Sequence, residues 1–301
     1  MAGSTPATAP FGRLLTAMVT PMTADGALDD EGIATLATYL VDRGNDGLVV
    51  SGTTGESPTT SDEEKERLIR TVVEAVGDRA TVVAGVGTYD TAHSVELARA
   101  AEKAGAQGLL VVTPYYSKPP QAGLIAHFGH IADSTGLPVM LYDIPARSGV
   151  AIKTETMQRL AEHDRIVAVK DAKGDLYETA TVLATTDLAV YSGEDALNLP
   201  LFAIGAVGAV SVVGHVCADR YAAMIRAVDA GDLTEARRIN ASVLPAVRGV
   251  MTRTQGAIMA KAALQLIGVL PRRTTRPPLC DATEEQMELL RADLSEAGLL
   301  P

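Results

Sequence analysis

Lys170 is the residue of this sequence that most directly suggests a reaction. It ends the apolar run Ile166–Lys170, so an ammonium group stands where a buried strand stops. Desolvation disfavours the charged form of a lysine and lowers its pKa from the ordinary value of about 10.4. The neutral amine is a nucleophile that forms a Schiff base with a ketone. The alternative is a structural lysine paired with a strand-end carboxylate such as Asp171.

The stretch Gly52–Glu56, Gly-Thr-Thr-Gly-Glu, is a candidate anion site because it follows the apolar run Gly47–Ser51. A tight turn after a strand can present several backbone N–H groups to one anion. The stretch lacks the GxxxxGK[ST] pattern of phosphate-binding loops, so a small carboxylate suits it better than a triphosphate. The alternative is a simple glycine turn.

Four further residues carry polar or aromatic groups at or shortly after the ends of apolar runs. Tyr142 ends the run Pro138–Tyr142, and a hydroxyl beside a Schiff base can pass protons. Arg147 lies in the following Pro–Gly turn and could clamp a carboxylate with two hydrogen bonds. Tyr115 and Tyr116 lie in a proline-flanked loop that suits contact with a neighbouring subunit. The alternatives are a buried tyrosine with a satisfied hydroxyl and a solvated arginine.

The chain alternates short apolar runs with helix-like stretches. The runs are continuous rather than alternating, which indicates strands of a parallel sheet buried on both faces. Eight such units, about 25 to 35 residues apart, predict an α/β fold of the closed (β/α)8 TIM-barrel type. An open doubly wound sheet fits less well, since no GxGxxG opens the first helix. The runs are Leu14–Thr20, Gly47–Ser51, Thr81–Gly87, Gly108–Thr113, Pro138–Tyr142, Ile166–Lys170, Leu188–Ser192 and Ala206–Val213.

We expect three segments: a flexible N-terminal tail over residues 1–12, the barrel over 13–230 and a C-terminal helical extension over 231–301. The extension carries three helical patterns, and its proline-rich connector with Arg272, Arg273 and Arg276 is typical of a solvated segment. Active sites of such barrels lie at the C-terminal ends of the strands, so the candidate residues should converge there. The helical patterns are Leu233–Val247, Thr254–Leu266 and Thr283–Ala297.

Composition and charge exclude several classes of binding partner and metal site. The 301 residues carry a net charge of −11 and no tryptophan, which argues against nucleic acid and anionic membranes. Cys217 and Cys280 do not form a disulfide framework, and the histidines show neither HExxH nor a Cys/His cluster that would bind zinc. Residues 1–10 have no signal-peptide pattern, and the longest apolar run is interrupted by glycines and a proline. We therefore expect a cytoplasmic location and no metal.

In combination, four motifs resemble the dihydrodipicolinate synthase family of pyruvate-dependent class I aldolases and lyases. They are GTTGE at 52–56, VTPYY at 112–116, YDIPxRSG at 142–149 and the strand-end Lys170. The resemblance runs from about Leu14 to Leu300. It implies a lyase that condenses pyruvate with L-aspartate 4-semialdehyde in the diaminopimelate route of lysine biosynthesis.

The resemblance implies catalytic roles for four residues. Lys170 would form an imine with pyruvate, so no other cofactor is expected. Tyr142 would donate and accept protons at that imine. Thr53 and Tyr116 would complete a relay to solvent, with Tyr116 supplied by a neighbouring subunit. That crossing implies a homo-oligomer, which the family suggests is a tetramer built as a dimer of dimers.

The same resemblance implies binding roles for four more residues. Thr54, together with Thr53, would hold the pyruvate carboxylate, and Arg147 would hold the carboxylate of the semialdehyde. Gly193 and the carbonyl of Val210 would line the pocket.

Some positions depart from the family pattern. Asp143, Asp171 and His215 replace residues more frequent there, without touching the imine chemistry. Some relatives bind lysine as a feedback inhibitor in one region of the chain. In that region this sequence has a cation, Lys65, and an imidazole, His93. We therefore predict weak or absent inhibition by lysine.

Two alternatives to the synthase remain open. A pyruvate-dependent sugar-acid aldolase or sialic-acid lyase would share the chemistry, although such a lyase tends to lack an arginine equivalent to Arg147. A non-catalytic paralogue could bind pyruvate-like ligands as a sensor, but it has no need of a proton relay. A phosphate-binding barrel isomerase is disfavoured because no phosphate motif follows the last two strands.

Overall fold

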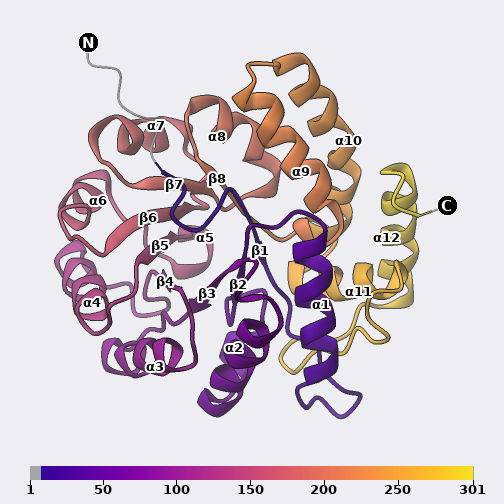
Figure 1. Cartoon of the computed structure of the whole chain (residues 1–301), viewed down its shortest axis with the longest axis horizontal. Helices are drawn as coiled ribbons and strands as arrows, with labels where there is room; N and C mark the ends of the chain where they lie inside the picture. The colour runs from indigo at the N-terminus through magenta and orange to yellow at the C-terminus, as the bar shows by residue number, and fades with distance from the viewer. Residues whose placement is uncertain (1–7, 301) are drawn as a thin grey trace.

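Eight parallel strands close into a barrel in chain order in the computed structural model, which describes residues 8–300 (Figure 1). Strand β8 pairs with β1 to complete the closure. The prediction of a (β/α)8 barrel is confirmed, and the open doubly wound sheet is excluded. The strands are β1 (Leu14–Ala17), β2 (Gly47–Val50), β3 (Thr81–Gly85), β4 (Gly108–Val112), β5 (Val139–Asp143), β6 (Ile166–Asp171), β7 (Ala189–Ser192) and β8 (Gly208–Ser211).

Several predicted runs extend past the strands because apolar residues continue into the buried connecting loops. After β1, for example, Met18 and Val19 lie in the core although neither belongs to the strand. Hydrophobicity reports burial, whereas the end of a strand is set by the last pair of the hydrogen-bonded ladder. The predicted ranges therefore locate each strand correctly but overshoot its C-terminal end in several cases.

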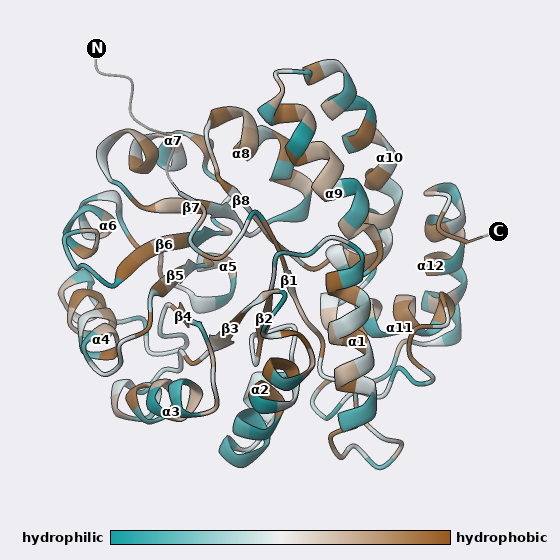
Figure 2. Ribbon diagram, viewed as in Figure 1, coloured by the Kyte–Doolittle hydropathy of each residue, from teal (hydrophilic) through white to brown (hydrophobic). Residues whose placement is uncertain are grey.

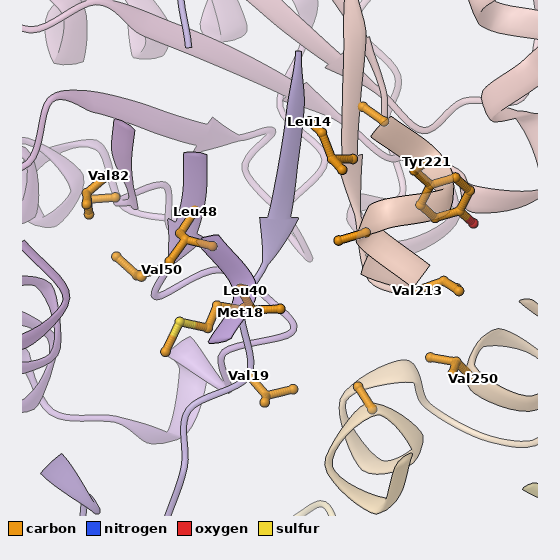
Figure 3. Packing of buried hydrophobic residues seen from close by; sticks show 14 of the residues in the cluster. Leu14, Met18, Val19, Leu40, Leu48, Val50, Val82, Val213, Tyr221 and Val250 are labelled. Carbon is orange, nitrogen blue, oxygen red and sulfur yellow. The ribbon is translucent and has the colours of Figure 1, made fainter. Parts of the chain in front are cut away.

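Two hydrophobic clusters explain why the runs are continuous. Side chains alternate between the two faces of a strand. In β5, Met140 and Tyr142 face the barrel interior, whereas Val139 and Leu141 belong to the layer between the strands and the helices. Figure 3 shows part of this outer layer, with Leu48 and Val50 of β2 near Met18. Both faces of every strand are therefore buried.

Helices surround the barrel, and Figure 2 shows hydrophobic strands enclosed by helices of mixed hydropathy. A capping box starts α2, since the Ser61 hydroxyl accepts from the backbone N–H of Glu64 and the Glu64 carboxylate accepts from that of Ser61. The helices are α1 (Asp30–Asp42), α2 (Asp62–Val76), α3 (Thr91–Lys103), α4 (Gln121–Asp133), α5 (Pro145–Ser148), α6 (Thr154–Leu160), α7 (Leu176–Thr185), α8 (Asn198–Ile204) and α9 (Gly214–Asp229); two 3-10 turns are η1 (Ser57–Thr59) and η2 (Asp195–Leu197).

Three helices follow the barrel, as the sequence predicted: α10 (Leu233–Met251), α11 (Gly256–Leu266) and α12 (Glu284–Glu296). Helices α10 and α11 pack on α9, and α12 packs on both of them. The connector between α11 and α12 corrects one prediction. It is not simply solvated, because Arg276 is largely buried and Arg273 bonds to Gln265 and Glu284.

At the N-terminus the structure describes the chain from Thr8 onward, so most of the segment predicted as a tail lies outside the described residues. Phe11 is fully buried, and its backbone N–H donates to the Tyr191 hydroxyl in the barrel interior at 3.2 Å. In the described part of the chain, every helix is too short or too polar to cross a membrane.

Candidate active site

Lys170 and Tyr142 meet at the C-terminal mouth of the barrel. They are partners in the parallel register of β5 and β6, and strand alternation turns both side chains inward. The Lys170 Nζ lies 4.2 Å from the centroid of the Tyr142 ring. Both residues are buried, at 4% and 5% exposure. The predicted convergence of these two residues is thus observed.

The Lys170 amine has no hydrogen bond or ion pair with any residue between 8 and 300. Burial lowers its pKa to about 8, the charges of Asp195 and Glu194 oppose that shift, and the charge of Arg147 adds to it. The alternative pairing with Asp171 is not seen. Asp171 instead accepts from the Thr179 hydroxyl at 2.6 Å. Lys170 therefore supplies a neutral amine far more readily than a solvated lysine does.

Gly193 leaves the space in which the Lys170 side chain lies. A Cβ atom at this position would come within 2.9 Å of Lys170 Cγ and 3.0 Å of the Asp171 carbonyl oxygen. The backbone N–H of Gly193 donates to that same carbonyl at 2.7 Å, which ties the end of β7 to β6. The sequence singled out this glycine only through the family resemblance, because its contact with the lysine has no local pattern.

The loop Ser51–Glu56 forms the facing wall. The backbone N–H groups of Thr53 and Thr54 donate to no acceptor within the described range, 8–300. The Gly55 carbonyl, by contrast, accepts from the Thr20 hydroxyl at 2.7 Å, which holds the loop against the segment that follows β1. Free N–H groups on a fixed loop suit a small anion such as a carboxylate.

A cavity with about 390 Å³ of empty space, open mouth included, joins this loop to Tyr142. Its walls also include Ser51, whose buried hydroxyl has no hydrogen-bond partner among the described residues, and Tyr115. The sequence did not single out Ser51, since it ends a strand pattern and looks like any polar strand terminus. The loop and Tyr142 thus share one cavity, and Lys170, which is not among the lining residues, contacts it through the tyrosine ring.

Tyr116 does not reach this cavity within one chain. It is 93% exposed, and the residue that lines the cavity is Tyr115, which packs edge-on against Tyr89 with ring centroids 5.5 Å apart. In the described structure, no hydrogen bond joins Thr53, Tyr142 and Tyr116 through their side chains. The relay expected from the resemblance is therefore not closed by residues of a single chain.

Arg147 and Val210 occupy different surroundings. Arg147 lies in α5, one turn after β5, where it is exposed, and its charge lowers the pKa of Lys170. Burial raises the pKa of Tyr142 to about 12, so this phenol keeps its proton. Val210 is buried in β8 with its side chain in the same interior cluster as Tyr142.

Sequence reasoning gave no role to Asp195, a buried carboxylate beside the site. It accepts from the backbone N–H groups of Val212 and Val213 at 2.9 and 3.0 Å, and from the Ser211 hydroxyl. These bonds tie the segment after β7 to the end of β8, and the carboxylate charge raises the pKa of Lys170 against the effect of burial. The Gly-Glu-Asp sequence after β7 was the only available signal.

The family model described as the dihydrodipicolinate synthetase family matches residues 10–297. This chain belongs to that family. The 4-hydroxy-tetrahydrodipicolinate synthase of Kineococcus radiotolerans is 68% identical over 292 residues, which cover 97% of this chain and 95% of the relative. The synthase of Acidothermus cellulolyticus is 68% identical over 96% of this chain and 94% of its own length.

Solved structures agree with the family. The synthase of Cyanidioschyzon merolae with lysine bound superimposes with a TM-score of 0.94 at 41% identity, covering 97% of this chain and 99% of that one. A dihydrodipicolinate synthase of Bacillus anthracis superimposes with a TM-score of 0.92 at 41% identity, covering 95% and 98%. The barrel and its C-terminal helices are thus common to these proteins.

Proposed function

We propose that this protein is a lyase that condenses pyruvate with L-aspartate 4-semialdehyde to form 4-hydroxy-tetrahydrodipicolinate. The observation that carries the proposal is the buried Lys170 amine, which has no hydrogen-bond or ion-pair partner among residues 8–300 and lies 4.2 Å from the Tyr142 ring. Relatives with this activity in their names, at 68% identity over nearly the whole chain, support the choice of substrates.

The first step is formation of an imine. The neutral Lys170 amine attacks the ketone carbon of pyruvate, a C–N bond forms, and the ketone oxygen leaves as water after taking up two protons. Tyr142 is the nearby group suited to move those protons, because its high pKa keeps a hydrogen on the phenol oxygen. The free N–H groups of Thr53 and Thr54 hold the pyruvate carboxylate during this step.

Condensation then uses the imine as an electron sink, so no other cofactor is required. Loss of a methyl proton gives an enamine, whose carbon attacks the aldehyde carbon of the second substrate while the aldehyde oxygen becomes a hydroxyl. The amino group of that substrate attacks the imine carbon and expels Lys170 as a free amine. Arg147 at the mouth binds the second carboxylate, and Gly193 and Val210 shape the pocket.

The exposed Tyr116 supports a homo-oligomer in which each site receives this residue from a neighbour. A homotetramer built as a dimer of dimers would provide that arrangement, and it would work in the cytoplasm. Sedimentation should then show assembly at assay concentration, and Tyr116→Phe should reduce turnover. A fully active monomer would contradict this part of the proposal.

A substrate panel tests the function. The purified protein should condense pyruvate with L-aspartate 4-semialdehyde and should not cleave sialic acid or sugar acids. The variant Arg147→Ala should raise the KM for the semialdehyde while leaving that for pyruvate near its original value. Cleavage of a sugar acid in preference to semialdehyde condensation would favour the aldolase alternative, and inactivity on every substrate would favour the sensor.

A further inference from the structure

The C-terminal extension reaches the carboxylate-binding loop through a buried ion pair. Lys261 of α11 donates through Nζ to Oε1 of Glu56, and each side chain is only 1% exposed. The same Nζ donates to the carbonyl of Thr274 at 2.7 Å. The other carboxylate oxygen of Glu56 accepts from the backbone N–H of Arg276 at 2.9 Å. Glu56, the last residue of the Gly52–Glu56 loop, is thus held from two parts of the extension.

Arg276 adds a second connection to the segment that follows the loop. Its Nη1 donates to the carbonyl of Thr59 at 2.8 Å, and its Nε donates to the carbonyl of Gly26 at 2.7 Å. The guanidinium also binds the Glu64 carboxylate, which lowers the pKa of that group to about 2. The connector therefore holds Glu56 and the segment that follows it, and joins them to the loop that contains Gly26.

The backbone of Glu56 makes this attachment relevant to the site. Glu56 has a left-handed conformation with φ 57°, which is unfavourable for a residue with a side chain and persists only where surrounding contacts impose it. In this conformation its N–H donates to the Thr53 carbonyl at 3.2 Å. The peptide groups of Thr53 and Thr54, whose N–H groups face no acceptor in the described residues, are oriented by that turn.

Stability alone does not account for such a pair. Burying two charges costs desolvation energy, and well-packed apolar residues often serve a fold at least as well. A buried ion pair does impose one geometry on the segments that it joins, because any displacement leaves a charge unpaired. Here the joined segments are α11 and the loop on which the proposed function places the pyruvate carboxylate.

We propose that Lys261 and Glu56 are positioning residues, through which the C-terminal extension sets the conformation of the Gly52–Glu56 loop and thereby the affinity for pyruvate. The inference rests on the proposed function only in its choice of ligand. Neither side chain contacts substrate in this account; both act through the backbone of Thr53 and Thr54.

The test compares two acid-to-amide changes in the same protein. Glu56→Gln removes the charge that Lys261 pairs with, whereas Asp293→Asn removes an equally buried carboxylate that binds Arg253 and Arg248 between α10 and α12, away from the loop. The readout is the pyruvate concentration that half-saturates borohydride-reducible labelling of Lys170, with kcat and KM for pyruvate measured in parallel below the Tm of each variant.

Glu56→Gln should raise the half-saturating pyruvate concentration and the KM about tenfold or more, with a smaller change in kcat, because the loop that holds the carboxylate loses its geometry. Lys261→Met should change them in the same direction. The double variant should be no worse than the more impaired single variant, since both changes remove one interaction. Asp293→Asn should stay within about twofold of the original protein. Equal effects of Glu56→Gln and Asp293→Asn would overturn the inference.

A second readout separates this inference from the proposed function. Amide hydrogen exchange of residues 52–56, measured without pyruvate, should be faster in Glu56→Gln and unchanged in Asp293→Asn. Unchanged exchange in both variants would overturn the inference even if the protein is a synthase. Absence of labelling in the unaltered protein would refute the proposed function, and the exchange result would still decide whether the extension holds the loop.

Discussion

Lys170 and Lys261 are both buried, at 4% and 1% exposure, yet their surroundings give the two amines different roles. Lys261 donates to Glu56 and to the carbonyl of Thr274, so its charge is compensated. Lys170 faces the Tyr142 ring with no hydrogen-bond acceptor among residues 8–300. Desolvation lowers the pKa of both amines, but only Lys170 is free to lose its proton and attack a ketone. A buried lysine thus becomes a nucleophile only where no carboxylate or carbonyl pairs with its amine.

The largest expected effect separates these lysines directly. Lys170→Met should reduce condensation by about 10⁴-fold or more, because no other group supplies the imine nitrogen. Lys261→Met should retain much of kcat but unfold at lower temperature, since a buried carboxylate loses its partner at a cost of about 3 kcal/mol. Steady-state assays and thermal melts of both variants provide the measurement. Substantial turnover by Lys170→Met would break the comparison.

The space beside Lys170 provides the next test. Gly193→Ala places a Cβ within 2.9 Å of Lys170 Cγ, so the amine should shift and kcat/KM should fall by about ten- to a hundredfold. Gly129→Ala in α4 is the matched control, because a Cβ there meets nothing within 4 Å and should be neutral or slightly stabilising. Equal kinetics for the two variants would show that the lysine tolerates displacement.

The pH dependence of imine formation should follow the Lys170 pKa of about 8. Below that value the labelling rate should rise about tenfold per pH unit, because only the neutral amine attacks, and above it the rate should level off. Trapping the pyruvate adduct between pH 6 and pH 10 gives this profile. A plateau reached only above pH 10 would mean that the amine titrates as a solvated lysine.

The free energy of unfolding should also depend on pH through Lys170, in a direction that its pKa determines. The pKa of Lys170 is lower in the folded protein than in the unfolded chain, about 8 against about 10.4, so between these values the unfolded chain binds more protons. The free energy of unfolding contributed by this group therefore rises with pH across that window, by at most about 1.4 kcal/mol per pH unit. Lys170→Met should lack this contribution in denaturant titrations at pH 8 and pH 10.

The smallest effect concerns a third buried lysine. Lys65 donates to the carbonyl of Thr60 and lies 3.6 Å from Asp62, which also contacts His93 at 2.8 Å. Lys65 and His93 thus already contact the Asp62 carboxylate, which leaves it less available to bind the ammonium group of an added lysine. Lysine should therefore inhibit weakly or not at all in a steady-state assay. Strong inhibition at micromolar lysine would contradict this interpretation.

The sequence was sufficient to predict the barrel and the meeting of Lys170 with Tyr142. Continuous apolar runs mark buried parallel strands, and consecutive strands in a barrel bring their C-terminal ends together, so strand-end residues are neighbours by topology. The Glu56–Lys261 pair spans 205 residues and has no local signal. The sequence predicts a solvated Arg276 for the same reason, since its acceptors belong to distant loops and to α2. Long-range polar contacts depend on tertiary packing that periodicity does not encode.

Lys170, and not Lys261 or another buried lysine, should be the amine that reacts with pyruvate. The most direct measurement is reduction of the protein with borohydride in the presence of pyruvate, followed by intact mass and a peptide map. One pyruvate-derived adduct per chain is expected, located on Lys170 and absent from Lys170→Met. No adduct on a folded, assembled sample, or an adduct on a different lysine, would contradict it.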